Sequence, residues 1–155
     1  RGAKGIGVTY ATTPMGADHT TGYAIAQNIL GVGGDVPPLQ VEGQVDLSRD
    51  LQIATAALDS TGLCLFVAFP MLDVPEVLEA IMEILTAYRG ETWPTDNYLE
   101  MGPKTLQPEL DFNRRAGFSS EDDRLPDFIR NEPLPPLNSV FDVPDEELDK
   151  VHAYS

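Results

Sequence analysis

Leucine and alanine recur at helical spacing between residues 47 and 58, and no other pattern constrains the fold of this chain more strongly. Leu47, Leu51, Ala54 and Leu58 occupy positions i, i+4, i+7 and i+11, which places their side chains on one face of an α-helix. Asp46 precedes the stripe and is the N-cap that we predict for this helix. Because an apolar helix face has to be buried, the pattern predicts a packed helical protein.

A second apolar stripe follows farther along the chain. Asp73 as N-cap and Pro75 in the first turn mark the expected start of this second helix, and Gly90 lies just past its expected end. The spacing predicts a buried face that consists of Val77, Leu78, Ile81, Leu85 and Tyr88. The segment Leu65–Phe69, between the two helices, is apolar throughout and is expected to lie in the core.

Charge and cysteine content exclude several functions. The chain has 155 residues, a formal net charge of −15 and one cysteine. Because phosphate binding requires clustered Lys and Arg, nucleic acid and anionic membrane surfaces are not expected partners. No apolar run approaches the ~20 residues of a membrane span. A single cysteine forms no internal disulfide and fits a reducing compartment, so we predict a cytoplasmic protein with one domain in this sequence.

The first predicted helix ends at the stretch Asp59-Ser60-Thr61-Gly62-Leu63-Cys64, which holds the only cysteine. The helix dipole disfavours a carboxylate at a C-terminus by up to ~1 kcal/mol, so Asp59 requires a partner: ligand N–H groups, a capping side chain or buried water. Gly62 permits a left-handed turn that brings the backbone close to a ligand. Cys64 has two interpretations, a small buried hydrophobic residue or a thiolate that binds a metal.

This stretch, Asp-x-x-Gly-Leu-Cys, resembles the pterin-binding motif of the tungsten-dependent aldehyde:ferredoxin oxidoreductase family. The resemblance implies that Asp59, Gly62 and Leu63 hold a tungstopterin (or molybdopterin). It also implies that Cys64 is the fourth ligand of an adjacent 4Fe-4S cluster and lies on the electron route between cluster and pterin. Such a cluster needs about four thiolates, so the other three would come from N-terminal domains that this sequence lacks.

The N-terminal part of the chain is rich in glycine and contains one of the two histidines. His19 stands in a loop between Asp18 and two threonines, where an imidazole can transfer a proton or donate a hydrogen bond, although a surface or capping histidine has the same pattern. Arg-Gly-x-x-Gly from Arg1, then Tyr-Ala-Thr and Gly-Ala-Asp-His, resembles the family's stretch over the tungsten site. By that resemblance His19 is the catalytic acid–base or orienting residue beside the metal, with Lys4 and Asp18 nearby.

Three further blocks resemble the C-terminal signature of the same family, in order: Phe112–Phe118, Asp122–Pro126 and Asn131–Leu134. Their polar residues are expected to cap helices and bridge segments. The resemblance therefore extends from Arg1 to about Lys150. It implies a mainly α fold, an irregular helical bundle that corresponds to the C-terminal helical domain of aldehyde ferredoxin oxidoreductase. Residues 1–155 would be a single domain of a longer protein whose N-terminal domains are absent from this sequence.

Two expectations concern the end of the chain. Pro103 and Pro108 interrupt a helical pattern, and an interior proline costs ~3 kcal/mol. We therefore expect one helix to end near Gly102 and a second helix to follow. Residues 131–155 are predicted to form an extended tail with a short terminal helix, and His152 is predicted to be exposed to solvent.

The resemblance implies an enzyme that oxidises aldehydes to carboxylic acids at a tungsten (or molybdenum) bis-pterin and passes electrons through the iron–sulfur cluster to ferredoxin. The expected partners are ferredoxin, a small aldehyde and the N-terminal domains of the same chain. On its own, this part of the protein is expected to hold no cofactor and to be inactive. Two alternatives stay open: a family relative that acts on a different substrate, and a helical interaction domain without a cofactor role.

Overall fold

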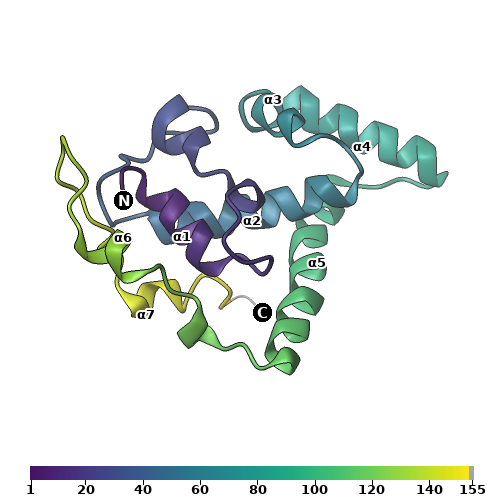
Figure 1. The fold of residues 1–155 in the computed structure, drawn as a ribbon. Helices are drawn as coiled ribbons and strands as arrows, with labels where there is room; N and C mark the ends of the chain where they lie inside the picture. The colour runs from purple at the N-terminus through teal and green to yellow at the C-terminus, as the bar shows by residue number, and fades with distance from the viewer. Residues whose placement is uncertain (154–155) are drawn as a thin grey trace.

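The computed structural model describes residues 1–153, which form an irregular bundle of helices (Figure 1). These residues contain no β-strand, only an isolated antiparallel bridge between Leu134 and Ser139. The mainly α fold is therefore confirmed, while the last two residues of the predicted domain and tail lie outside the described part. The elements, with 3₁₀ or π turns marked η, are α1 (Lys4–Thr12), η1 (Thr20–Gly22), η2 (Ala26–Leu30), α2 (Gln44–Ser60), η3 (Leu65–Val67), α3 (Ala68–Asp73), α4 (Pro75–Arg89), α5 (Thr95–Ala116), η4 (Ser120–Asp122), α6 (Asp127–Asn131) and α7 (Asp145–Leu148).

Helix α2 is the central element, and α1, η1 and α5 all pack against it (Figure 1). Leu47, Leu51 and Leu58 are buried on α2, as their spacing predicts. Leu58 belongs to a cluster shared with α4 and α5, whereas Leu47 and Leu51 belong to a separate one. The helix thus connects two parts of the core, and its C-terminal end lies beside the cluster that contains Leu58.

The start of α2 differs from the prediction. Asp46 is not the N-cap, because the helix begins at Gln44 and the capping position is Gly43 in a left-handed conformation with φ of 80°. Gln44 is fully buried, and its side-chain amide donates to the Pro37 carbonyl at 2.9 Å. The helix thus begins three residues before the apolar pattern, where this hydrogen bond holds the first residue. Asp46 lies in the first turn, where a negative charge is favourable.

The interface between α1 and α2 is held by buried hydroxyl and amide groups. Thr9 Oγ1 lies 2.7 Å from Ser48 Oγ and donates to the Gly22 carbonyl at 2.8 Å. The side-chain amide of Gln52 donates to Thr12 Oγ1 at 3.0 Å. Hydrogen bonds between buried polar groups specify orientation, because an unpaired partner would cost about 1–3 kcal/mol. This network therefore fixes η1, and the loop before it, against α2.

Helix α5 is continuous through both prolines, so the predicted break near residue 102 was wrong. A proline removes the hydrogen bond to the carbonyl four residues earlier, which belongs to Leu99 for Pro103 and to Lys104 for Pro108. Both Leu99 and Lys104 are exposed residues. Water can hydrate carbonyls on an exposed face, and packing against α2 stabilises the rest of the helix. The sequence pattern contains no information about that packing.

Helix α5 approaches α2 closely at Gly102. A Cβ atom on Gly102 would lie 2.7 Å from Ile53 Cγ2 and 2.8 Å from the Ile53 carbonyl carbon. One turn earlier, Tyr98 is almost completely buried, and its hydroxyl donates to the Ala54 carbonyl at 3.1 Å and to Met71 Sδ at 3.3 Å. A missing side chain and a buried phenol together bring the two backbones into contact.

Helix α4 buries less of its surface than the spacing predicts. Ile81 is buried, but Tyr88 is 89% exposed because the C-terminal end of α4 extends away from the rest of the bundle (Figure 1). Gly90 ends the helix with φ of 75°, as predicted. Asp73 is not the N-cap; its carboxylate instead accepts a hydrogen bond from the Gly33 N–H at 2.6 Å.

The C-terminal segment returns across α1 (Figure 1). Phe141 packs on Gly7 so closely that a Cβ there would lie 2.5 Å from its ring, and both residues adjoin the buried Val8. Lys4 forms an ion pair with Asp142. Helix α7 lies where the short terminal helix was predicted. None of the helices in residues 1–153 is both long enough and apolar enough to cross a bilayer.

Candidate functional site

The C-terminal end of α2 is a tight hydrogen-bonded turn. The Gly62 N–H donates to the Asp59 carbonyl at 3.0 Å. Thr61 Oγ1 donates to the Leu58 carbonyl at 2.6 Å and accepts from the Leu63 N–H at 3.2 Å. Gly62 has φ of 79°, and the space where its side chain would project is empty to 4 Å. The predicted left-handed turn is therefore confirmed, and its backbone is open to a ligand.

The carboxylate of Asp59 lies in an unfavourable electrostatic environment. Partial burial raises its pKa, and the negative charge of Asp18 raises it further. Burial would also raise the pKa of Asp18, but hydrogen bonds from Thr20 and Thr21 outweigh that effect and lower it. Burial and then the Asp59 charge raise the pKa of Tyr98 to about 12, so that phenol stays neutral. No hydrogen bond within residues 1–153 stabilises the Asp59 carboxylate.

The loop that carries His19 is fixed at both of its ends. Asp18 accepts hydrogen bonds from the Thr20 N–H at 3.1 Å and the Thr20 hydroxyl at 2.7 Å, which closes a turn around His19. Gly22 then packs on α2, where a Cβ would lie 2.8 Å from Gln52 Cγ. His19 itself is exposed. An exposed imidazole on a rigid loop is available to a ligand.

A series of aromatic contacts connects the His19 loop to the segment after Cys64. The ring centroids are 5.8 Å apart for Tyr10 and His19, and 5.9 Å for His19 and Tyr23. They are 5.8 Å apart for Tyr23 and Phe69, and 6.0 Å for the stacked pair Phe69 and Phe66. The two regions singled out in the sequence therefore lie next to each other. Sequence reasoning did not single out the two tyrosines, although Tyr10 stands inside one of the matching blocks.

Cys64 is exposed, which contradicts its interpretation as a buried hydrophobic residue. The apolar segment that follows was also predicted incorrectly. No residue of Leu65–Phe69 is fully buried, and Phe66 is 75% exposed. Val67 and Ala68 pack against the core around α4 and α5, and Leu65 is half-buried, but Phe66 faces solvent. Composition alone indicated burial, whereas the path of the backbone after Gly62 determines which side chains reach the core.

Lys4 does not join this group. It pairs with Asp142 at the N-terminal end of α1, while Tyr10 lies near the C-terminal end of the same helix. Within residues 1–153, no three His, Cys, Asp or Glu side chains converge as a metal site would require. Cys64 is the only thiol in the sequence. The site as described can therefore supply one thiolate, one carboxylate, one imidazole and an open backbone turn.

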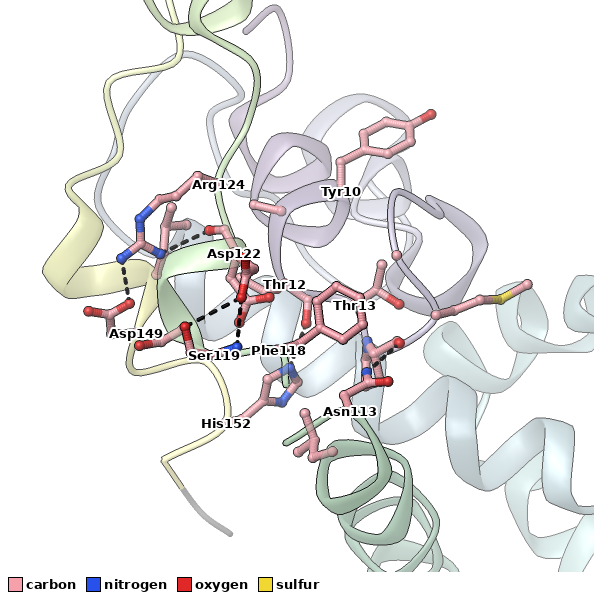
Figure 2. A pocket seen from close by; sticks show the side chains of 18 of the residues that line it. Tyr10, Thr12, Thr13, Asn113, Phe118, Ser119, Asp122, Arg124, Asp149 and His152 are labelled. Carbon is pink, nitrogen blue, oxygen red and sulfur yellow. Dashed lines mark hydrogen bonds and ion pairs between the residues drawn. The ribbon is translucent and has the colours of Figure 1, made fainter. Parts of the chain in front are cut away.

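A pocket of about 860 Å³ lies beyond the C-terminal end of α1 (Figure 2). Its walls come from the loop after α1, the end of α5, the segment around η4 and the end of the described chain. Asn113 crosses between two of these walls and donates to the Pro14 carbonyl at 2.7 Å. This bridging role is the one that the sequence predicted for Asn113. Tyr10 borders the pocket, but in Figure 2 its ring projects away from His152.

His152 lines this pocket, so its predicted exposure was wrong. Its Nε2 lies 2.7 Å from the Thr12 carbonyl, and burial lowers the pKa of the imidazole. Burial has the opposite effect on the carboxyl group of Asp123, whose pKa it raises to about 6. Asp122 and Asp149 add to this rise, and Arg124 opposes it. The prediction for His152 failed because it used only the position near the end of the sequence. In the structure, the C-terminal segment packs across α1 and brings His152 against the end of that helix.

A family model described as "Aldehyde ferredoxin oxidoreductase, domains 2 & 3" matches residues 1–153. The chain belongs to this family. The aldehyde ferredoxin oxidoreductase match extends over the whole described part, and it includes both the His19 loop and the turn at the end of α2. The resemblance recognised in the short sequence blocks is therefore confirmed.

Named relatives agree with this assignment to the aldehyde ferredoxin oxidoreductase family. The tungsten-containing aldehyde ferredoxin oxidoreductase of Pyrococcus furiosus is 34% identical over 137 residues, and that of Pyrococcus horikoshii is 34% identical over 140 residues. The protein of the same name from Thermococcus kodakarensis is 32% identical over 137 residues. In each case the match covers 87% of this chain but 22% of the relative. The chain thus spans about a fifth of the length of these enzymes.

Proposed function

We propose that this chain is the C-terminal domain of a tungsten (or molybdenum) pterin enzyme that oxidises aldehydes to carboxylic acids. The overall reaction consumes one aldehyde and one water and yields a carboxylic acid, two protons and two electrons. The electrons would leave through an iron–sulfur cluster to ferredoxin. The names of the relatives support tungsten, an aldehyde and ferredoxin.

One observation carries the proposal: the His19 loop lies beside the end of α2 and the segment after Cys64. The charge of Asp18 is close enough to raise the pKa of Asp59. The Tyr23 ring contacts His19 on one side and Phe69, five residues after Cys64, on the other. The His19 loop, the turn at the end of α2 and the segment that follows Cys64 are therefore neighbours. Each of these groups alone has ordinary structural explanations, but their convergence on one surface favours a shared function.

The turn at residues 59–63 fits a polar heterocycle. The Asp59 carboxylate has no hydrogen-bond donor within residues 1–153, and partial burial and the charge of Asp18 raise its pKa. Pterin N–H groups would supply the missing donors. The absence of a side chain at Gly62 and the open space beside it leave room for the flat edge of such a ring. Leu63 would present its backbone while its side chain stays in the core cluster.

Cys64 fits the role of a cluster ligand because its thiol is exposed at the edge of the same turn. A 4Fe-4S cluster is held by about four cysteine thiolates, and this sequence contains one. The remaining thiolates would have to come from outside residues 1–155. When bound, the pterin metal and the cluster would supply the redox chemistry, and this chain would position them.

His19 is proposed to handle the proton. Its imidazole is exposed and lies on a loop that two tight contacts immobilise. A neutral imidazole can donate a hydrogen bond to the substrate oxygen, and it can also accept a proton that the oxidation releases. Asp18 keeps its own charge through its hydrogen bonds with Thr20 and would stabilise the imidazolium form.

The decisive experiment replaces Cys64 in the full-length enzyme. Cys64→Ala should lower the iron content and abolish electron transfer to ferredoxin, whereas Thr92→Ala, an exposed loop change after α4, should alter neither. Unaltered iron and activity in Cys64→Ala would favour a helical interaction domain instead. Residues 1–155 expressed alone should contain neither iron nor tungsten by elemental analysis. Stoichiometric metal in that sample would contradict the need for ligands from elsewhere in the protein.

A further inference from the structure

The imidazole of His19 is held between two tyrosines from different elements. Tyr10, near the end of α1, contacts one side at a centroid distance of 5.8 Å and an interplanar angle of 43°. Tyr23, just after η1, contacts it at 5.9 Å and 46°. Only Tyr10 adds a polar interaction, because its hydroxyl lies 3.3 Å from His19 Nδ1. Within residues 1–153, the ring makes no other hydrogen bond.

We infer that Tyr10 is a positioning residue for His19: its hydroxyl donates to Nδ1 and holds the neutral imidazole in the tautomer that carries hydrogen on Nε2. A neutral imidazole has one nitrogen that donates and one that accepts, and the partner of one nitrogen determines the role of the other. With Nδ1 engaged as an acceptor, Nε2–H is the group left to donate to a substrate oxygen. This inference rests on the proposed proton-handling function of His19.

The neighbouring carboxylates do not take this orienting role. Asp18 is adjacent in the chain, but its oxygens accept from Thr20 and Thr21 and not from the ring. The charges of Asp18 and His19 act on each other without a hydrogen bond. Asp59, on α2, interacts with the charge of Asp18 and makes no hydrogen bond to the His19 ring. Among residues 1–153, the Tyr10 hydroxyl is thus the group positioned to select a tautomer.

The hydroxyl of Tyr10 can be removed without removing its ring contact. Tyr10 is 37% exposed and belongs to none of the three core clusters, so Tyr10→Phe should fold like the parent chain. Tyr23→Phe is the matched control because it removes a phenol oxygen on the other side of the same imidazole. Tyr23 contacts His19 through its ring and not through a hydrogen bond.

Long-range ¹H–¹⁵N NMR of the ¹⁵N-labelled chain tests the tautomer directly. The sequence contains two histidines, so His152 serves as an internal reference. At a pH high enough for the imidazole to be neutral, His19 Nδ1 should resonate as an unprotonated nitrogen. In Tyr10→Phe that resonance should move toward the value of a protonated nitrogen, while Tyr23→Phe and the His152 signals should not change. An unchanged His19 spectrum in Tyr10→Phe would overturn the inference.

Kinetics of the full-length enzyme separate this inference from the proposed function. Tyr10→Phe should lower kcat by about 10- to 100-fold with little change in KM, as for other partners that orient a functional imidazole. Tyr88→Phe, on the exposed end of α4, is the control and should leave both constants unchanged. A changed tautomer with an unaltered kcat would contradict the role of His19 in catalysis. It would leave the Tyr10–His19 contact itself supported.

Discussion

Substituting Gly102 by alanine is the sharpest test of how α2 and α5 pack. The new Cβ would collide with the Ile53 carbonyl oxygen and lie 2.8 Å from the carbonyl carbon, whereas ordinary contacts begin at 3.4 Å, so the two backbones must separate by at least about 0.6 Å. Overpacking of this kind costs about 1–3 kcal/mol, and the upper end applies here because backbone cannot rotate away. Alanine also gains about 1 kcal/mol of helix propensity over glycine. The net loss of unfolding free energy should be about 2 kcal/mol.

Thermal unfolding followed by circular dichroism measures this loss. For a domain of this size, about 2 kcal/mol corresponds to a fall in Tm of roughly 4–8 °C. Gly117→Ala is the matched control, because Gly117 ends the same helix with φ of 100° and has no atom within 4 Å of a built Cβ. Its left-handed strain should cost about 1–2 kcal/mol without any clash. A Gly102→Ala variant at least as stable as the parent chain would refute the close approach of α2 and α5.

Three further predictions follow from burial and charge. Burial raises the pKa of Asp123 to about 6 from 3.8, so the folded protein holds a proton that the unfolded chain releases, and stability should fall as pH rises through this window. The Asp123→Asn variant has no carboxylate to titrate, so it should not show this fall. Between pH 4 and pH 7 its unfolding free energy, relative to that of the parent chain, should increase by on the order of 1 kcal/mol after solvent screening. Urea unfolding measures this difference, and a difference that stays constant with pH would contradict the prediction. Phe66 is 75% exposed, so Phe66→Ala should change the unfolding free energy by less than about 0.5 kcal/mol. Leu58 is completely buried, so Leu58→Ala should cost about 2–5 kcal/mol. Equal urea midpoints for the two variants would contradict the assigned burial of these two side chains. Because the Cys64 thiol is exposed, one equivalent of a thiol reagent should react with it in the folded protein nearly as fast as in the unfolded chain. Absorbance measures the reaction, and strong protection in the folded protein would contradict the exposure.

Secondary structure was predictable where local pattern and packing agree. The stripe through Leu47, Leu51 and Leu58 predicted α2 because burial of one face is repeated at helical spacing. The same reasoning failed at Pro103, where contacts with α2 outweigh the local cost of proline. Tyr88 continues the spacing of α4 but no other segment covers it. Periodicity indicates which residues share a face and does not indicate how far along the helix that face is covered.

The candidate site was predictable in part. Asp59, Gly62 and Cys64 were singled out because a carboxylate at a helix end, a glycine able to turn left-handed and a lone thiol are close in sequence. His19 was singled out because its neighbours are polar. The contacts that join these two regions were not predictable, since Tyr23 reaches both His19 and Phe69 across more than forty residues of chain.

The sequence by itself determined that this chain is helical, where α2 ends, and that it belongs to the aldehyde ferredoxin oxidoreductase family. Those properties are local, because apolar spacing and short motifs are read within a few turns of chain. Only the tertiary structure decided that Cys64 and Phe66 face solvent, that α5 continues through its prolines, and that Tyr10 contacts the His19 ring. Those outcomes depend on which distant segments cover a given surface, and no local pattern encodes that.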